Sequence, residues 1–292
     1  MTTFALKLIA CILMLIDHIG TFIPNAPLWF HWVGRLSAPI FIYSMLWGIH
    51  YTKSKKTYVI RMYIFSVSIS LINTLLNHFF VYYGSFDTFV KNNIFTTLFA
   101  ISSFIILHDY CQNHSKGKKI WKYYCLWQLF STVLIFLIEP LTASGSEMVQ
   151  ILSSITGNIF YIEFGFKFLI LGLVLNSTKD SKLKLSIYYA SYCFIYFILT
   201  TLAIVPNGLY RFNIWGLSTI YEVGMEVFHA VIGIDFFEKF ASPLYINYQW
   251  MMIGALPFMF TYNKKKGRNA KYFFYFFYPI HIYILWLIGN IK

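Results

Sequence analysis

Long apolar runs fill most of the chain, and short polar segments separate them. A helix needs about 20 mostly apolar residues to cross the hydrocarbon core of a bilayer. Because lipid offers no hydrogen-bond partners, each such run must close its own backbone bonds as a helix. The pattern therefore predicts an all-α polytopic membrane protein with nine transmembrane helices, at 4–23, 33–51, 58–82, 89–108, 121–142, 148–176, 184–205, 243–262 and 272–290.

A tenth apolar stretch, at 212–237, is interrupted by four ionisable residues: Glu222, Glu226, His229 and Asp235. An Asp, Lys or Arg at the centre of a span costs roughly 2.5–3.5 kcal/mol. We therefore predict that 207–241 forms a re-entrant or interfacial helix on the outer side, and a ten-span arrangement is the alternative. The first three ionisable residues share one helical face, which is either a wetted surface or a lip over an outer substrate opening.

Composition leads to the same class of protein. Of the 292 residues, 58% are hydrophobic and 12% are charged, against about 25% charged in soluble domains. A soluble chain of this size buries at most about 75% of its surface and could not hide so much apolar area. No polar segment is long enough to fold alone, so 1–292 is predicted to be a single transmembrane domain.

The distribution of charge predicts the orientation of the chain. The net charge of +12 would suit a nucleic-acid partner, but most of the cations lie in short loops between predicted spans, so no nucleic acid is expected. Positively charged loops stay in the cytoplasm. The rule places the N-terminal end there, together with the basic loops 53–61, 116–122, 179–184 and 264–271. A tenth span would put the last of these loops outside.

Ionisable residues inside spans are functional candidates by default. Asp17 and His18 lie in the outer half of the first predicted span, and Arg35 lies in the second. Pro24 and Pro27 mark the turn between these spans, so Asp17 and Arg35 lie at similar depth in an antiparallel pair. We predict that they form an ion pair, which either serves catalysis or only pins two helices. His18 points about 100° away from Asp17 and can accept a proton near neutral pH.

Several short motifs carry a resemblance to a known family. They are Asp17-His-Ile-Gly20, Arg35-Leu-Ser-Ala-Pro-Ile-Phe41, Thr57-Tyr-Val-Ile-Arg61, Asn93-Ile-Phe-Thr-Thr-Leu98, Tyr262-Asn-Lys-Lys-Lys-Gly267 and Tyr278-Pro-Ile-His281. In this order they resemble the TraX family, whose founding member acetylates the N-terminal amine of a conjugative pilin. The first two spans are also similar to those of polytopic acyltransferases, which carry acyl groups from cytosolic acyl-CoA to acceptors at the other membrane face. The middle of the chain, about 110–240, carries no such motif.

The resemblance implies a multi-pass acetyltransferase of a bacterial plasma membrane. Its co-substrate is acetyl-CoA, its other partners are membrane lipid and an exported protein, peptide, lipid or glycan acceptor, and the essential histidine of the related families falls on His18. Acyl transfer needs a base and donors for an oxyanion. We expect His18 to be the base, with Asp17 or a backbone carbonyl fixing its tautomer. Arg35, Asn93 or His281 would be the oxyanion donors, and His31 is an alternative base.

Cytosolic cations are expected to pair with the phosphates of CoA. The candidates are Lys55, Lys56, Arg61, Lys264, Lys265 and Arg268. The same cations also serve topology and anionic lipid. No His, Cys or acidic residues stand at metal-ligand spacing, so no metal is expected.

Two other classes of function remain open. One is a transporter, in which Asp17, Arg35 and Glu163 form an ion or proton relay. The other is a non-catalytic membrane component of a conjugation or secretion apparatus, in which Asp17 and His18 are replaceable.

Overall fold

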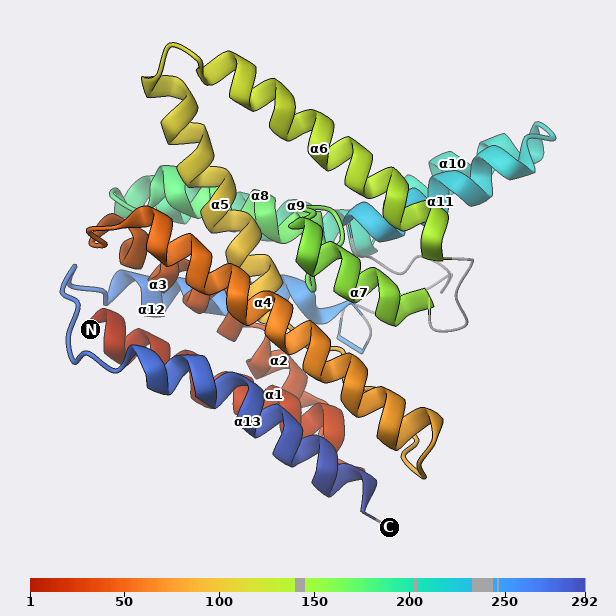
Figure 1. The fold of residues 1–292 in the computed structure, drawn as a ribbon, viewed down its shortest axis with the longest axis horizontal. Helices are drawn as coiled ribbons and strands as arrows, with labels where there is room; N and C mark the ends of the chain where they lie inside the picture. The colour runs from red at the N-terminus through yellow and green to blue at the C-terminus, as the bar shows by residue number, and fades with distance from the viewer. Residues whose placement is uncertain (140–144, 202–203, 233–243, 246, 292) are drawn as a thin grey trace. The chain divides into compact units, whose positions relative to one another are not determined.

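The computed structural model describes residues 1–139, 145–201, 204–232, 244–245 and 247–291, and every regular element in these ranges is helical (Figure 1). The all-α prediction is therefore confirmed. The chain forms two compact units. Unit 1 contains Met1–Trp47 and Val174–Gly289, and unit 2 contains Gly48–Leu173 and Asn290–Lys292. The expectation of one transmembrane domain over the whole chain stays a prediction.

Within the described ranges, five helices are long and apolar enough to cross a membrane. Each matches one of the predicted spans. They are α1 (Thr3–Phe22), α4 with the π-helical turn that follows it (Lys55–Tyr82), α5 (Ile94–Asn113), α6 (Gly117–Ile138) and α13 (Lys271–Asn290). The predicted count of nine spans is not confirmed. Three of the four remaining runs form interrupted helices, and α9 (Lys182–Thr201), formed by the fourth, is not among the five.

Three of the predicted spans are broken into two helices. The run 33–51 forms the end of α2 (Trp29–Gly34) and α3 (Ser37–His50). The run 148–176 forms most of α7 (Gly145–Thr156) and α8 (Phe166–Thr178). The run 243–262 contains the 3₁₀ helix η3 (Tyr248–Ala255) and α12 (Leu256–Phe260).

The break between α7 and α8 has a clear backbone cause. Gly157 and Gly165 have φ values of 65° and 72°, which lie in the left-handed region that ends a right-handed helix. Hydropathy does not reveal φ, so an apolar run with two such glycines looks like one uninterrupted span.

The single helix predicted at 207–241 is wrong. The described part of this region forms two helices, α10 (Ile204–Ile214) and α11 (Ser218–Ile232). Gly216, at φ 77°, turns the chain between them. Their lengths of 11 and 15 residues fall short of the roughly 20 needed for a full span. Two residues of the predicted polar face, Glu226 and His229, have side chains outside the described part of the chain, and Asp235 lies outside it altogether.

The remaining long helix, α9 (Lys182–Thr201), belongs to unit 1 and corresponds to the predicted span 184–205. It packs against η3, and the Tyr189 hydroxyl donates a 2.5 Å hydrogen bond to the backbone carbonyl of Met252. The Met252 carbonyl belongs to the 3₁₀ segment, whose backbone is not regular α-helix. Lipid offers no hydrogen bond to such a carbonyl, and Tyr189 provides one.

In unit 1, the first and last long helices pack in parallel. The rings of Phe4 and Phe274 lie 5.7 Å apart near the start of both helices, and His18 contacts His281 further along. Figure 1 shows α1 and α13 side by side with their C-terminal ends toward the same edge. Two parallel spans start at the same membrane face, so the Thr3 end and the Asn290 end lie on opposite faces.

The basic loop before α13 is bonded to the first turn of α1. The Thr3 amide donates to the Lys265 carbonyl at 2.9 Å, and the Phe4 amide donates to the Lys266 carbonyl at 3.2 Å. The Thr3 and Tyr262 hydroxyls share a buried 2.9 Å hydrogen bond. The loop therefore lies at the membrane face where α1 begins, as the charge distribution predicts. The ten-span alternative would put these bonded segments on opposite faces.

Polar side chains of α4 bind the loop before α5 and the neighbouring helix α7. The Asn77 side chain donates to the Val90 carbonyl at 3.0 Å and accepts from the Val90 amide at 2.8 Å. Ser70 and Ser154 share a buried hydrogen bond of 2.5 Å between α4 and α7. Lipid provides no hydrophobic force to bring helices together, so such bonds contribute to association within a membrane.

Parallel packing of α1 and α13 gives a direct labelling test. We expect Asn25→Cys and Ile291→Cys to react with a membrane-impermeant maleimide at one face, and Lys265→Cys to react only at the other face. Each substitution is made in a chain whose four native cysteines are replaced, and sealed vesicles of known orientation are used. Labelling of Lys265→Cys and Ile291→Cys from the same side would exclude the parallel arrangement.

Candidate functional site

Two adjacent residues of α1 point to different neighbours. Successive helical residues are rotated by about 100°, so Asp17 and His18 cannot face the same helix. Asp17 contacts α2 and the residue that follows it, whereas His18 contacts α13. The site therefore consists of two clusters on two sides of one helix.

The first cluster contains the predicted ion pair. The Arg35 Nη2 donates to both carboxylate oxygens of Asp17, each at 2.6 Å. His31 Nδ1 lies 2.9 Å from Asp17 Oδ1 and completes the cluster. The side chains of Asp17 and Arg35 are 15% and 21% exposed, so both charges are largely withdrawn from solvent and each stabilises the other.

The 3₁₀ helix η3 covers this cluster. The Arg35 Nη1 donates to Gln249 Oε1 at 3.3 Å. The Tyr248 ring lies 5.4 Å from the Arg35 guanidinium carbon and stacks on His31 at 5.9 Å between centroids. Guanidinium groups stack favourably on aromatic faces. The guanidinium thus already contacts a carboxylate, an amide and a ring. Its expected role as an oxyanion donor stays a prediction.

A glycine allows α1 and α2 to approach this closely. A Cβ placed at Gly34 would overlap the side chain of Asp17. Any other residue at this position would push Asp17 away from Arg35. Gly34, the residue directly before Arg35, therefore allows the ion pair to form at this distance.

The second cluster is a buried pair of histidines. His18 Nδ1 lies 2.7 Å from His281 Nε2, and the two rings are stacked with centroids 5.0 Å apart. His281 Nδ1 lies 2.6 Å from the backbone carbonyl of Phe277, one turn earlier in α13. Each histidine is 6% exposed. We expected Asp17 or a backbone carbonyl to hold the ring of His18, but His281 holds it instead.

The hydrogen-bond partners assign the protons in this pair. A carbonyl oxygen only accepts, so His281 Nδ1 must carry the hydrogen that binds Phe277. In the neutral ring, His281 Nε2 is then an acceptor, and His18 Nδ1 must be the donor. It follows that the remaining nitrogen, His18 Nε2, holds a lone pair. Within the described part of the chain, this nitrogen has no hydrogen-bond partner.

Cations meet at one indole ring at the other end of unit 1. Lys179 Nζ lies 5.9 Å from the centroid of Trp47, and Lys264 Nζ lies 5.4 Å from the same centroid. Two basic loops that are far apart in the sequence thus converge. Lys264 adopts a left-handed backbone, at φ 58°, which is rare for a residue with a side chain. Lys265 and Arg268 are exposed on the same loop.

The other predicted CoA ligands belong to unit 2. Lys55 Nζ forms a 3.5 Å ion pair with Asp109, and Lys56 is exposed beside it. The Arg61 guanidinium carbon lies 6.0 Å from the centroid of the Tyr58 ring. Their role in CoA binding stays a prediction.

Asn93, a predicted oxyanion donor, also lies in unit 2. Its side-chain nitrogen donates to the Ser66 carbonyl and to Ser70 Oγ, each at 2.8 Å. An amide nitrogen has two hydrogens, so both are used to join α5 to α4. The amide of Asn93 therefore has no hydrogen left to donate to an oxyanion.

Sequence reasoning missed the roles of Tyr248, Gln249 and Lys179. The charge pattern gave one usable signal, since it placed 179–184 and 264–271 at the same membrane face. It gave no sign that the two loops share Trp47. Nor did it indicate that an apolar run near 248 would supply an amide and a ring to Arg35.

Breaking the Asp17–Arg35 pair should destabilise the protein. Removing one partner leaves a buried charge uncompensated, and we expect Asp17→Ala and Arg35→Ala each to cost about 3 kcal/mol of unfolding free energy, the lower end of the range for buried pairs. The exchanged double mutant, Asp17→Arg with Arg35→Asp, should recover part of the loss. Ile12→Ala, at a position 52% exposed on the same helix, is the matched control. Thermal unfolding in detergent measures all four, and normal stability of both single mutants would disprove the pairing.

The comparison with known proteins agrees with the motifs. A family model described as TraX protein matches residues 3–289, which is nearly the whole chain. No protein of curated function and no solved structure matches the chain. The matched region contains α1, α2 and η3, and all but the last residue of α13. On this match the chain belongs to the TraX family.

Proposed function

We propose that this protein is an integral membrane acetyltransferase. It would move an acetyl group from cytosolic acetyl-CoA to an amine or hydroxyl of an exported or membrane-bound acceptor, such as the N-terminus of a pilin, peptide or lipoprotein. The observation that carries this proposal is the hydrogen-bonded chain from the Phe277 carbonyl through His281 to His18. It leaves one imidazole nitrogen with a lone pair at a buried position within a membrane helix.

The proposed chemical role of His18 follows from this lone pair. Acetyl-CoA supplies the acetyl group as a thioester. His18 Nε2 takes the proton of the attacking amine or hydroxyl as the new N–C or O–C bond forms and the C–S bond breaks. His18 then returns that proton to the departing sulfur, so that CoA leaves as a thiol. Positioned acid–base catalysis of this kind contributes about 10²–10⁴-fold to a rate.

The placement of His18 along α1 suits a reaction between two membrane faces. From Thr3 to His18 the helix rises by roughly 22 Å, at about 1.5 Å per residue. This length is comparable to the extended pantetheine arm of CoA. From His18 to Phe22 the helix rises by only about 6 Å. A donor whose phosphates stay at the basic face could therefore present its thioester to His18, while the acceptor arrives from the nearer, outer face.

The cations of unit 1 fit the phosphates of such a donor. Lys264 and Lys179 converge on Trp47, and Lys265 and Arg268 belong to the same loop as Lys264. Ammonium groups form strong, charge-assisted hydrogen bonds to phosphate oxygens. The hydrogen bonds from Thr3 and Phe4 fix this loop in advance. We therefore assign the donor phosphates to Lys264, Lys265, Arg268 and Lys179.

His31 is the competing candidate for the base, because Asp17 orients it as a carboxylate orients the histidine of a hydrolase. The contact between His31 and Asp17 is explained by charge, because Asp17 is a buried carboxylate that needs partners. The contact between His18 and His281 joins two imidazoles and neutralises no carboxylate. Transport and a scaffold role in a conjugation or secretion apparatus remain the alternative functions. Both alternatives predict that the protein transfers no acetyl group, so replacing His18 would not change acetylation.

Replacing His18 should abolish transfer without unfolding the protein. Mass spectrometry of surface proteins, lipids and glycans from cells with and without the protein identifies the acceptor first. We then expect His18→Ala and His18→Gln to lower turnover by about 10²–10⁴-fold, while acetyl-CoA binding stays close to that of the wild type. His31→Ala is the control variant. A His18→Ala enzyme with more than a tenth of wild-type turnover, together with an inactive His31→Ala enzyme, would move the role of base to His31.

The two amide variants of His281 should differ. The Gln amide lies near the position of Nε2 and can accept from His18 Nδ1, whereas the Asn amide lies near Nδ1 and cannot. A single hydrogen bond contributes about 0.5–1.5 kcal/mol, so we expect His281→Gln to be up to roughly tenfold more active than His281→Asn. Equal activity of both variants, at equal thermal stability, would show that His281 does not orient His18.

The donor site makes a prediction about binding alone. We expect the double variant Lys179→Gln, Lys264→Gln to bind acetyl-CoA at least about tenfold more weakly, because a hydrogen bond to a charged group contributes about 1.5–3 kcal/mol. Equilibrium dialysis of the purified protein measures this affinity. The pair Lys118→Gln, Lys122→Gln removes the same charge from another basic loop. Equal weakening by both pairs would indicate general electrostatics and no specific site.

A further inference from the structure

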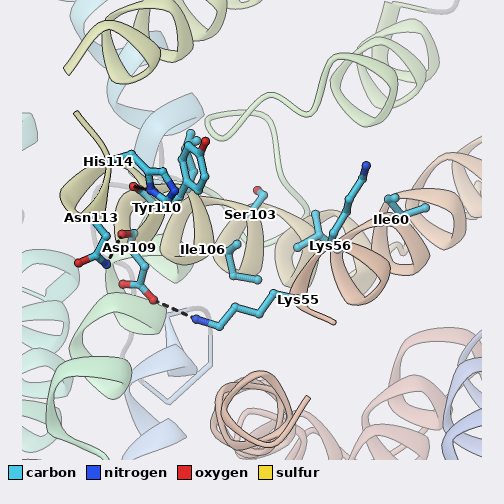
Figure 2. A pocket seen from close by; sticks show the side chains of 11 residues that line it. Lys55, Lys56, Ile60, Ser103, Ile106, Asp109, Tyr110, Asn113 and His114 are labelled. Atoms are coloured by element: carbon cyan, nitrogen blue, oxygen red, sulfur yellow. Dashed lines mark hydrogen bonds and ion pairs between the residues drawn. The ribbon is translucent and has the colours of Figure 1, made fainter. Parts of the chain in front are cut away.

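Unit 2 contains a groove that the proposed reaction does not use. It lies between the first turns of α4 and the last turns of α5 and has a volume of about 570 Å³. Ligand pockets usually measure about 300–1,000 Å³. Figure 2 shows the side chains that line it, which come from both helices.

The walls of the groove are apolar. Val59 and Ile60 come from α4, and Ile106 and Leu107 come from α5. Ile60 is 44% exposed. In a helix that crosses a bilayer, an exposed apolar wall contacts hydrocarbon chains and not water. The walls therefore suit an acyl chain.

The rim of the groove carries a net positive charge. Lys55 and Asp109 neutralise each other in their 3.5 Å ion pair. Lys56 lies on the same turn, lines the groove and has no ion-pair partner within the described ranges. His114 Nδ1 donates to the Tyr110 carbonyl at 2.8 Å, so the side chain at this end of α5 is held in place. The charge left over at the rim is the ammonium of Lys56, which attracts an anion.

Depth distinguishes the rim from the walls. Lys56 is the second residue of α4, and Asn113 is the last residue of α5, so both lie where the helices leave the membrane. Ile60 lies about 6 Å deeper than Lys56 along the helix, at about 1.5 Å per residue. Ser103 lies about 15 Å deeper than Asn113 on the same scale. The anionic part of a ligand would thus lie at headgroup level and its apolar part in the hydrocarbon core.

We infer that this groove binds an anionic phospholipid of the leaflet on the basic side of the membrane. One acyl chain lies along Ile60 and Leu107, and the phosphate lies beside Lys56. Cation-rimmed pockets between membrane helices are suited to acidic headgroups. Acetyl-CoA also carries phosphates, but its two-carbon acyl group would leave the apolar walls empty. The inference does not depend on acetyl transfer.

The test measures lipid retained by the purified protein. Native mass spectrometry follows dioleoyl phosphatidylglycerol and dioleoyl phosphatidylcholine, each added to delipidated protein. We expect phosphatidylglycerol to bind more tightly than phosphatidylcholine. Lys56→Gln should weaken the binding of phosphatidylglycerol about fivefold, which is the contribution of one lysine to binding at an anionic membrane surface. Lys118→Gln is the control and should change the affinity by less than about twofold. Equal affinity for both lipids, or equal effects of the two variants, would overturn the inference.

A second measurement needs no variant. Photo-reactive phosphatidylglycerol with a diazirine in its acyl chain should label peptides that contain Ile60 and Leu107 in the wild-type protein. Excess unlabelled phosphatidylglycerol should prevent the labelling, and acetyl-CoA should not. Protection by acetyl-CoA would identify the groove as the donor site instead.

Discussion

The charge of Asp17 sets the rotation of α1 about its axis, and the rest of unit 1 depends on that rotation. A carboxylate within a membrane helix must face a partner, because lipid cannot solvate it. Arg35 and His31 lie on the α2 side, so Asp17 turns toward them. The next residue, His18, is then directed about 100° away and meets α13. The ion pair thus contributes more than stability, since it determines which helix receives the imidazole.

The long helices could be predicted from the sequence, and their interruptions could not. Hydropathy alone located α1, α4, α5, α6 and α13, because a run of about 20 apolar residues has one stable form in lipid. The same signal passes through Gly157 and Gly165 without change, although their left-handed backbones end the helices. The helix pair α10 and α11 was missed for a related reason. Its turn depends on φ at Gly216, which composition does not report.

The candidate site divides along similar lines. The pairing of Asp17 with Arg35 followed from their equal distance to a proline-marked turn, because a short loop forces neighbouring spans to be antiparallel. The contact of His18 with His281 joins residues 263 positions apart, and no local pattern encodes it. The sequence also could not assign the proton on each imidazole nitrogen. That assignment rests on the backbone carbonyl of Phe277. Every residue has such a carbonyl, so the sequence does not show which one binds His281.

The separation of these contacts along the chain has a consequence for biogenesis. Arg35 follows Asp17 by 18 residues, so the carboxylate can be neutralised as soon as the second segment enters the bilayer. His281 comes near the end of synthesis, and the loop that binds the first turn of α1 comes just before it. Early membrane insertion is therefore protected by a local contact, while the two imidazoles meet only after the intervening helices have been inserted. In a nascent or prematurely terminated chain, Arg35 can neutralise Asp17 of the first helix, but His281, the partner that orients His18, is absent.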